Sequence, residues 1–482
     1  MNVTRASTFV ATVLATTMLT TTFLATSALA QQAPLRPDQQ AYRALLKEMV
    51  ETDTSITTGS CTALAEKIEG HLRGAGFTSA EIHRFAVPEF PKEGGIVAIL
   101  PGSSKKAKPI LLLGHLDVVV AKREDWTRDP YAFIEEGGYF YGRGVADMKA
   151  MDATWVDMLM RWRKAGKVPK RTIKLALTCG EETSTAFNGA DWLAKNRREL
   201  IDAEFALNEG GSGRTDKPLE DGGRVVVQTI HVGEKTPVNY RIEATNPGGH
   251  SSTPVKENAI YELADAVARI RDFDFPLMLN DTTRAYFSKA GAARSDAMGK
   301  AMVAIAANPA DSQAEALLNT DRAFHSMLRT TCVATLLDGG HANNALPQRA
   351  GANINCRIFP SVSAEDVRKT LETVIADSKM TVVRTDNRGP DAKAPPLNPA
   401  IIGPAEKLVA KYYPGVPMVP VMSTGATDGV FLSAVGIPSY GPPGFFGNPD
   451  GNGVHGLNER VSIQSVFTGR DLLTELVTAY AF

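Results

Sequence analysis

Short unbroken runs of apolar residues alternate with stretches of helical periodicity in the first half of the chain. A short apolar run between turn residues predicts a buried strand, whereas apolar residues at three- and four-residue spacing predict one face of a helix. The predicted strands are 95–100, 109–113, 173–178 and 205–207, and the predicted helices are 41–73, 148–162 and 186–198. Strands that alternate with helices predict an α/β layer, with a mostly parallel mixed sheet flanked by helices.

The pattern changes near residue 235. Residues 238–244 alternate between apolar and polar, as a half-buried strand does, and 277–328 is a long Ala-rich stretch that favours helix. The other elements predicted in this region are strands at 331–337, 352–359 and 380–385 and helices at 259–271 and 364–377. These elements predict an open-faced layer of strands backed by helices, with 277–328 as an additional helical segment.

The α/β pattern returns after a joint rich in Pro, Gly and Asn at 387–399, and it ends in a helix at 462–480. The predicted organisation is therefore one α/β unit in two pieces, residues 31–234 and 393–482, interrupted by an inserted unit at 235–392.

Residues 1–30 have the composition of a targeting segment. Arg5 is their only charged residue, an apolar run follows at 9–24, and Ala-Leu-Ala at 28–30 forms a small-x-small cleavage signal. This pattern predicts a secretory signal peptide removed before Gln31, and therefore an exported protein, periplasmic or secreted. A single membrane anchor is the alternative. No later stretch approaches the ~20 apolar residues of a spanning helix, so we expect no membrane association after cleavage.

Charge excludes one class of partner. The 482 residues include 52 Lys and Arg against 53 Asp and Glu, which gives a net charge of -1. This balance provides no electrostatic basis for binding nucleic acid or an anionic membrane surface.

Four cysteines lie beyond the predicted signal peptide: Cys61, Cys179, Cys332 and Cys356. Four are too few for a disulfide scaffold in a chain of this length, and a bridge at Cys179 would be awkward beside an acidic pair. We therefore expect free buried thiols, with a Cys332–Cys356 pair as the alternative.

Histidine and acidic residues follow three predicted strands. His115 and Asp117 follow the first, Glu181 and Glu182 the second, and Glu209 the third. Open α/β sheets place their sites at the carboxyl ends of parallel strands, so these side chains are predicted to gather at one edge. Taken singly, each has a structural explanation as a hydrogen-bonded core histidine or a solvated loop acid.

Two further residues complete the candidate set. Asp147 stands just before a predicted helix, where a capping role is the simple alternative, and His455 lies in a loop rich in Gly and Asn. Two histidines and three carboxylates form a mixed N/O set that suits zinc, and also cobalt or manganese. A two-metal site with one bridging carboxylate needs five protein ligands, and the Glu181–Glu182 pair leaves one carboxylate as a proton shuttle.

The order Gly-His-x-Asp, Asp, Glu-Glu, Glu, His resembles the co-catalytic di-zinc metallopeptidases, the family of aminoacylase, glutamate carboxypeptidase and succinyl-diaminopimelate desuccinylase. The resemblance runs from about Ala41 to the C-terminus, and the wording of the motifs is most similar to carboxypeptidase S-like members. It implies two Zn²⁺ per chain, for which Co²⁺ or Mn²⁺ could substitute. The implied roles are His115 and Glu209 on one zinc, Glu182 and His455 on the other, Asp147 bridging both, and Asp117 orienting His115.

The resemblance also implies a mechanism. Glu181 would be the general base on a metal-bridging water and then the acid that protonates the leaving amine. The peptide bond after the bridging aspartate is often cis in this family, so Asp147–Met148 is expected to be cis.

In the family the inserted unit is a ferredoxin-like lid and dimerisation domain. The motif at 246–252 matches the family's histidine that stabilises the oxyanion, here His250, in some members across a dimer interface. By the same resemblance Asn344 contacts substrate, Arg357 grips the substrate carboxylate, and Gly425 belongs to a glycine-rich substrate-binding turn. Because minimal dimeric members have a shorter insertion than this one, whether His250 acts in cis or in trans stays open.

The leading functional prediction is a zinc hydrolase of amide bonds next to a free carboxylate, of the carboxypeptidase or dipeptidase type. Its substrate would be a small peptide, and an N-acyl-amino-acid deacylase is the alternative within the same fold. A homodimer through the inserted domain is expected. A non-catalytic exported binding protein is the alternative of another class, but it would require the loss of a ligand or of the base, and none is missing.

Overall fold

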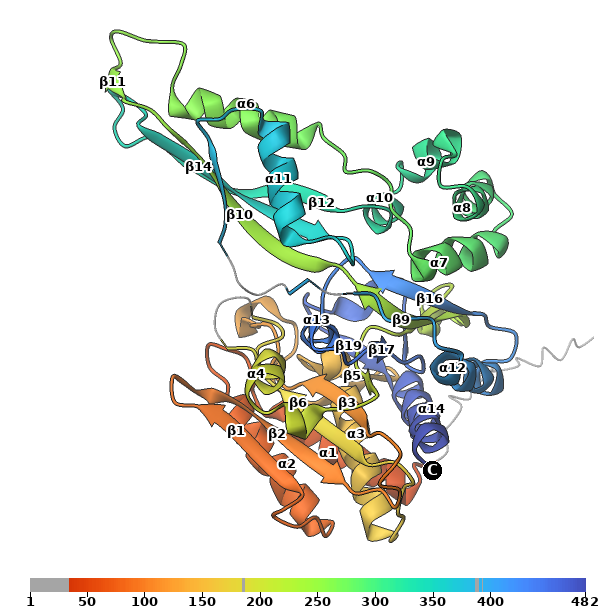
Figure 1. The fold of residues 1–482 in the computed structure, drawn as a ribbon. Helices are drawn as coiled ribbons and strands as arrows, with labels where there is room; N and C mark the ends of the chain where they lie inside the picture. The colour runs from red at the N-terminus through yellow and green to blue at the C-terminus, as the bar shows by residue number, and fades with distance from the viewer. Residues whose placement is uncertain (1–33, 184–186, 386–389, 392) are drawn as a thin grey trace, which may run out of the picture.

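The computed structural model describes residues 34–183, 187–385, 390–391 and 393–482. The predicted signal peptide lies outside these residues. The chain forms a large sheet covered by helices on both faces, and a smaller sheet that rises from it (Figure 1). Among the described helices, none combines the length and apolar character that crossing a bilayer requires.

The large sheet is mixed, with four neighbouring parallel strands in the centre and further parallel pairs at β8–β18 and β9–β16. β6, β3, β7 and β17 run parallel to one another, whereas β2 is antiparallel to β6 and β9 is antiparallel to β17 and to β8. Its strands in spatial order are β1 (Ile82–Val87), β2 (Phe90–Leu100), β6 (Ile173–Thr178), β3 (Ile110–His115), β7 (Phe205–Leu207), β17 (Ser439–Gly441), β9 (Val225–Glu234), β8 (Gly213–Thr215) and β18 (Phe446–Gly447), with β16 (Met418–Ser423) paired to β9.

Helices bury both faces of this sheet. Along β3, Leu112 packs into the core shared with one set of helices, and Leu111 and Leu113 pack into the core on the opposite face. Strands buried on both faces consist of continuous apolar residues, which is why the runs in this part of the sequence do not alternate. The first set is α1 (Pro37–Glu51), α2 (Cys61–Gly74), α3 (Ala150–Lys164), α12 (Pro399–Tyr412) and α14 (Ile463–Ala481); the second is α4 (Gly189–Asn196), α5 (Arg198–Ile201) and α13 (Gly429–Ala434).

The predicted helical stretch 41–73 is two helices. α1 ends at Glu51, and Asp53 organises a turn by accepting hydrogen bonds from the Ser55 amide and hydroxyl and from the Thr58 hydroxyl. The Ser60 hydroxyl then caps α2. Polar side chains that bond to nearby backbone compete with helix, and apolar spacing alone does not show this competition.

The inserted unit is a four-stranded antiparallel sheet with two helices on one face. Its strands are β12 (Thr331–Gly339), β14 (Arg349–Ile358), β10 (Thr236–Thr245) and β15 (Thr381–Arg384) in spatial order, and its helices are α6 (Ala259–Arg271) and α11 (Ala364–Ile375). Val238, Tyr240 and Ile354 belong to the core between the sheet and these helices. At the far end, β11 (Gly249–His250) pairs with β13 (Ala345–Leu346) to form a tip (Figure 1).

The additional helical segment forms a separate bundle at the opposite end of the inserted unit from the tip. Phe287, Ile305 and Leu318 lie in its core, and Val421 of β16 packs against that core. The segment therefore rests on the edge of the large sheet. Its helices are α7 (Asp281–Ala292), α8 (Ala297–Ala307), α9 (Ser312–Leu318) and α10 (Arg322–Met327).

A small three-stranded sheet was not predicted. It pairs β4 (Ile134–Glu136) with β5 (Tyr139–Tyr141), and β5 with β19 (Arg460–Ser462). The β5–β19 pairing brings the loop that carries His455 next to the turn that carries Asp147.

The expectation of free thiols is wrong, because all four cysteines are disulfide-bonded. Cys332 and Cys356 stand opposite each other in the β12–β14 ladder, so this alternative pairing is confirmed. Cys61 and Cys179 also form a disulfide, across a sequence separation of 118 residues. Such a separation leaves no local signal in the sequence.

Candidate active site

The carboxyl ends of three parallel strands supply most of the site. His115 is the last residue of β3, Glu181 and Glu182 lie just beyond β6, and Glu209 lies just beyond β7. Asp147 sits in the turn that precedes α3. The Asp147–Met148 peptide bond is cis, as the family resemblance implied.

The five predicted ligands come together in two groups that share Asp147. His115 Nε2 lies 3.2 Å from Asp147 Oδ1 and 3.8 Å from Glu209 Oε1. His455 Nε2 lies 3.1 Å from Asp147 Oδ2 and 3.0 Å from Glu182. Within each group the ligand atoms lie within 4.8 Å of one another. Because each oxygen of Asp147 faces a different histidine, this carboxylate is placed to bridge two cations.

The electrostatics of the cluster favour cations. Burial raises the pKa of Glu209, and it raises the pKa of Glu182 to about 7. Burial and the neighbouring Glu209 carboxylate also raise the pKa of Glu181 well above its usual range. Carboxylates crowded in a buried space resist ionisation unless positive charge is nearby, so the donor set suits divalent metal ions.

The ring of His115 is oriented by the backbone of Asp117. His115 Nδ1 donates to the Asp117 carbonyl oxygen at 2.9 Å, because a carbonyl can only accept. This bond leaves Nε2 free to bind a metal, the usual arrangement for a histidine ligand. The Asp117 carboxylate was expected to orient the ring, but its Oδ1 is 3.9 Å from Nδ1.

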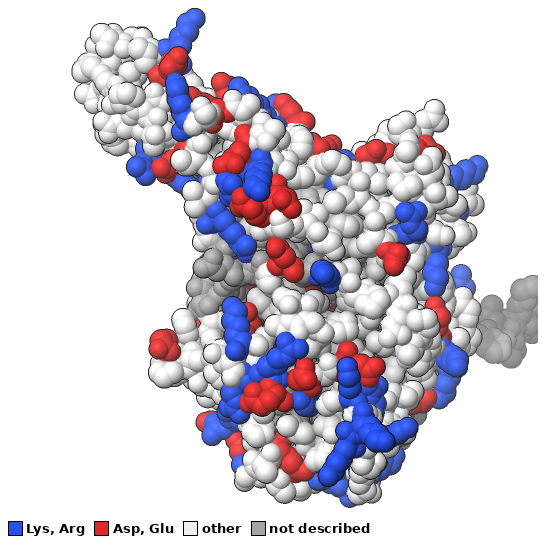
Figure 2. All heavy atoms as spheres, viewed as in Figure 1, with Lys and Arg blue, Asp and Glu red and all other residues white. Residues whose placement is uncertain are grey.

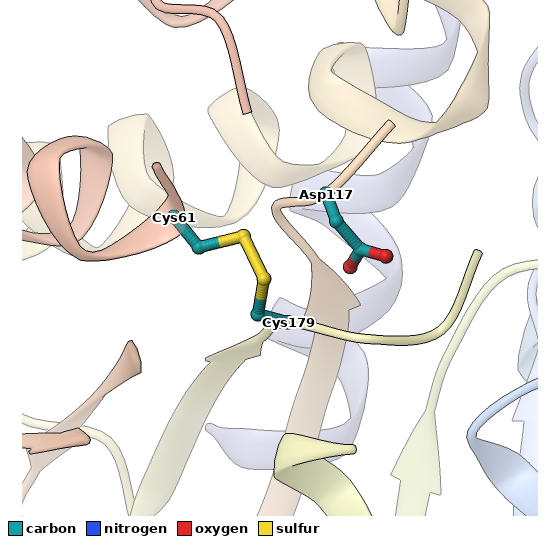
Figure 3. A group of neighbouring side chains, drawn as sticks. All are labelled: Cys61, Asp117 and Cys179. Atoms are coloured by element: carbon teal, nitrogen blue, oxygen red, sulfur yellow. A yellow bond between two sulfur atoms is a disulfide. The ribbon is translucent and has the colours of Figure 1, made fainter. Parts of the chain in front are cut away.

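The Asp117 carboxylate holds the turn with the two glutamates instead. Its oxygens accept the amides of Gly180 at 2.8 Å, Glu181 at 3.4 Å and Glu182 at 2.9 Å. Figure 3 shows this carboxylate beside Cys179, at the start of the same turn. Asp117 therefore acts on the site from two sides, through its carbonyl on His115 and through its carboxylate on the glutamates.

Glu459 and Arg143 are site residues that sequence reasoning missed. The buried Glu459 carboxylate accepts the amides of Gly144 at 2.9 Å, Ala146 at 2.9 Å and Asp147 at 3.1 Å. Arg143 donates to Glu459 at 2.8 Å and to the carbonyl of the residue after His455 at 2.7 Å. This pair fixes the Asp147 turn against the His455 loop.

A cavity of about 590 Å³ lies between the two units, and Arg357 lines it together with Glu181, Glu182 and His455. Arg357 is half-buried, and burial lowers its pKa. Within the described residues, no carboxylate raises the pKa of its guanidinium through an ion pair. An unpaired guanidinium at the wall of a cavity is suited to a carboxylate ligand.

The glycine-rich turn that contains Gly425 borders the same cavity through Thr427 and Asp428. The buried Glu234 carboxylate accepts the Thr427 amide at 2.7 Å, and Asp428 accepts the Thr178 hydroxyl at 2.9 Å. These buried acids anchor the turn to the large sheet, next to the end of β6.

A second cavity, of about 480 Å³, also reaches the ligand cluster, at residues that do not line the first cavity. Asp147 and Glu209 form part of its wall. The rest is largely apolar, with side chains that include Met148, Met151, Phe445, Phe446 and Val454.

His250 and Asn344 do not join the cluster. Both are exposed at the tip, where the Ser251 amide donates to the Asn344 carbonyl at 3.0 Å. The His250 ring contacts Ser252, two residues along the chain. Neither side chain contacts the five ligand residues within one chain.

Comparison with known proteins gives a consistent result. Residues 111–479 match the description "Peptidase family M20/M25/M40". The human N-fatty-acyl-amino acid synthase/hydrolase PM20D1 is 26% identical over 452 residues, which cover 92% of this chain and 88% of that one. The probable carboxypeptidase S-like 2 of Dictyostelium discoideum is 26% identical over 394 residues, which cover 80% of this chain and 75% of that one.

A solved structure shows the same fold. The M20 family metallo-carboxypeptidase Sso-CP2 from Sulfolobus solfataricus aligns with a TM-score of 0.68 at 18% identity, covering 92% of this chain and 99% of that chain. The family match includes every residue of the ligand cluster. The chain therefore belongs to peptidase family M20/M25/M40, and it is a metallohydrolase that acts on peptide or other amide bonds.

Proposed function

We propose that this hydrolase cleaves an amide bond next to a free carboxylate, as a carboxypeptidase or dipeptidase does. The proposal rests on one observation: Arg357 lines the same cavity as Glu181, Glu182 and His455. A planar guanidinium binds a carboxylate through two parallel hydrogen bonds, which fixes orientation as well as position. A substrate held in this way presents its neighbouring amide to the ligand cluster.

The metals fit the donor set. His115 and Glu209 would hold one Zn²⁺, His455 and Glu182 the other, and Asp147 both, with Co²⁺ or Mn²⁺ as chemically equivalent substitutes. When bound, the two ions supply polarisation of the scissile carbonyl and acidification of the attacking water.

Glu181 is the proton carrier. It lies within 4.8 Å of the ligand atoms of His115 and Glu182, and it is not needed as a ligand in either group that contains Asp147. Its carboxylate accepts a proton from the water that attacks the amide carbon. The same proton passes to the nitrogen as the C–N bond breaks, which yields a carboxylic acid and an amine. A base of raised pKa suits both halves of this cycle.

A specific observation favours a second candidate, the hydrolysis of N-acyl amino acids. The largely apolar cavity of about 480 Å³ meets the cluster at Asp147 and Glu209, two ligands that do not line the cavity of Arg357. Its size and apolar lining suit an acyl chain, while Arg357 holds the carboxylate of the amino acid. The human relative is named an N-fatty-acyl-amino acid synthase/hydrolase.

The inserted unit is proposed to pair with a second copy of the chain, which would bring His250 and Asn344 to the partner's cluster. In the described structure these two residues lie at the tip, away from the ligands of their own chain. Residues 246–255 and 339–348 of the tip include no Asp, Glu, Lys or Arg, and Figure 2 shows this tip uncoloured. A neutral tip can enter another copy without burying unpaired charge.

Export is proposed on the N-terminal segment. Two disulfides in one chain are typical of an oxidising compartment, which supports the proposal. N-terminal sequencing of the protein from its native host should begin at Gln31, and a chain that retains residues 1–30 would contradict cleavage.

The substrate proposal is tested with pairs of substrates that differ only in their C-terminus. N-acyl amino acids and dipeptides are compared with their C-terminal amides, on the wild type and on Arg357→Ala. We expect the free carboxylate to be preferred by about 100-fold in kcat/KM, and Arg357→Ala to lose most of that preference, because a charge-assisted bidentate contact is removed.

Arg368→Ala is the matched control, because Arg368 is an arginine of the same unit that pairs with Glu365 and Glu372 on α11. It should keep the wild-type preference. Equal cleavage of acids and amides by the wild type would overturn the carboxylate proposal.

A further inference from the structure

The turn that carries both glutamates is covalently tied to helix α2. Cys179 follows the last residue of β6 and precedes Gly180, and it is bonded to Cys61, the first residue of α2 (Figure 3). The exposed fractions of Cys61 and Cys179 are 1% and 4%, so the bond lies in the interior. Glu181 and Glu182 come two and three residues after the bridged cysteine.

Hydrogen bonds hold the same turn close to the disulfide, because the Asp117 carboxylate lies beside the two bridged cysteines. The Asp117 carboxylate accepts three consecutive amides of the turn, and the Gly189 amide donates to the Cys179 carbonyl at 2.7 Å. Gly180 has a φ of 95°, and a Cβ there would lie 1.8 Å from the Phe187 carbonyl oxygen. The backbone conformation of the turn is therefore narrowly constrained at its first residue.

Cys61 and Cys179 both belong to the buried core on the α2 side, but packing there is incomplete. A cavity of about 220 Å³ lies there, and its walls include Cys61, Ser55, Phe90 and Gly180. Next to this cavity the disulfide is the covalent link between the turn and the helix.

We propose that the Cys61–Cys179 bridge is a positioning element that holds Glu181, the general base, and Glu182, a metal ligand, in their working geometry. The inference rests on the proposed function of these two residues. A proton carrier and a ligand on one turn both lose efficiency when the turn moves by about 1 Å. The bridge limits that movement where packing leaves space.

The second disulfide provides a matched control. Cys332 and Cys356 join β12 to β14, two strands already paired along their length in the inserted unit. Neither residue lines the cavities that reach the ligand cluster. Removing the Cys332–Cys356 disulfide therefore deletes one cross-link of the same kind but leaves the glutamate turn tied to α2.

The experiment compares the full-length mature protein with Cys61→Ala/Cys179→Ala and with Cys332→Ala/Cys356→Ala, all loaded with zinc. Two quantities are measured below the unfolding transition of each protein: steady-state hydrolysis, and hydrogen exchange of the Gly180, Glu181 and Glu182 amides. For the first variant we expect kcat to fall at least about tenfold with KM within about twofold, because the reacting groups and not the substrate contacts are displaced.

The same variant should exchange the three amides at least about tenfold faster, since local opening becomes easier. The Cys332→Ala/Cys356→Ala variant should keep wild-type kcat and exchange, whatever happens to its melting temperature. The single variants Cys61→Ser and Cys179→Ser should each match the Cys61→Ala/Cys179→Ala variant, because either one breaks the same bond. If the double variant does not fold, the single variants are measured in its place.

Unchanged kcat and unchanged exchange in the Cys61→Ala/Cys179→Ala variant would overturn the inference. Equal losses in the two double variants would also overturn it, since they would reveal general destabilisation. A wild type that hydrolyses nothing in the substrate panel would refute the proposed function, whereas amide exchange would still report whether the bridge holds the turn.

Discussion

One carboxylate organises the metal cluster. Asp147 directs Oδ1 to His115 and Oδ2 to His455, at 3.2 and 3.1 Å. Its turn is held by Glu459, whose carboxylate accepts three backbone amides from residues 144–147. Such supporting contacts orient metal ligands, and their loss typically lowers metal affinity or activity by about 10- to 100-fold.

Substitution is predicted to distinguish the roles of the two adjacent glutamates, Glu181 and Glu182. Glu181→Gln should lower kcat by about 10²- to 10⁴-fold while leaving the metal content unchanged, because it removes the proton carrier and no ligand. Steady-state kinetics and metal analysis on the same preparation check both parts.

Glu182→Gln is the matched variant, one residue away. It should weaken the binding of one metal by about 100-fold or more, because a charged ligand carboxylate becomes a neutral amide and loss of a supporting contact alone costs about 10- to 100-fold. If Glu181→Gln loses metal while Glu182→Gln keeps its metal and loses kcat, the two roles have been assigned the wrong way round.

Sequence reasoning predicted His115, Glu181 and Glu209 as neighbours because parallel strands end at one edge of a sheet. It could not predict Glu459, whose amide partners lie 312 to 315 positions earlier in the chain. It placed His250 and Asn344 in the site by resemblance, and the described chain leaves them at a distant tip. Pairing of side chains with remote backbone, or with a second copy, has no signature in one sequence.

At the scale of elements, β12 is one of the two edges of the inserted sheet, the other being β15. Val333, Leu336 and Leu337 on this strand are 59%, 69% and 69% exposed. An edge strand with exposed apolar side chains is a ready site for pairing with another chain. The proposed partner is a second copy, aligned so that each tip approaches the other's ligand cluster.

Leu336→Lys is predicted to convert a dimer into a monomer, because it places a charge in the proposed interface. Light scattering across a range of protein concentrations measures the mass. If His250 acts in trans, kcat should fall together with the dimer fraction. Val168→Lys is the control, since Val168 is 63% exposed on the other unit, and it should stay dimeric. A wild type that is monomeric at all concentrations would contradict the pairing.

Several elements with strong local patterns were predicted well, but the longer strands β1 and β9 were missed, and elements defined by tertiary contacts were not predicted. The bounds predicted for 173–178, 205–207 and 259–271 match β6, β7 and α6. The three-residue strands β8 and β17 were missed, because their pairing depends on neighbours and not on their own composition. The break between α1 and α2 was missed because side chains of Asp53 and its neighbours create it.

At the scale of the whole molecule, the two units join where β9 passes into β10, at the buried residues Glu234 and Lys235. The Lys235 ammonium donates to Ser326 at 3.1 Å and to Thr331 at 3.3 Å, so the additional helices and β12 both meet at this junction. Burial raises the pKa of Glu234 to about 8 and lowers the pKa of Lys235 to about 7.

Glu234 gives the stability a defined pH dependence. Between the ordinary pKa of a glutamate and about 8, Glu234 is protonated in the native state and ionised in the unfolded state. The free energy of unfolding of the wild type therefore falls as pH rises through that window. Glu234→Gln cannot ionise, so its stability relative to wild type should improve between pH ~5 and ~9 by about 1–3 kcal/mol.

Thermal unfolding of both proteins across that pH range measures the difference, and the contribution of Lys235 cancels because both proteins contain it. A difference that does not change with pH would show that Glu234 is ionised in the native protein.

The central claim is that this chain is a two-metal hydrolase, and metal analysis combined with chelation tests it most directly. The purified mature protein is analysed for bound metal, and hydrolysis of N-acyl amino acids and dipeptides is assayed before chelation, after chelation and after zinc is returned. We predict about two divalent ions per chain, hydrolysis that disappears with the metal, and recovery on its return. Hydrolysis that persists in metal-free protein, or a protein that binds no divalent ion, would contradict the account.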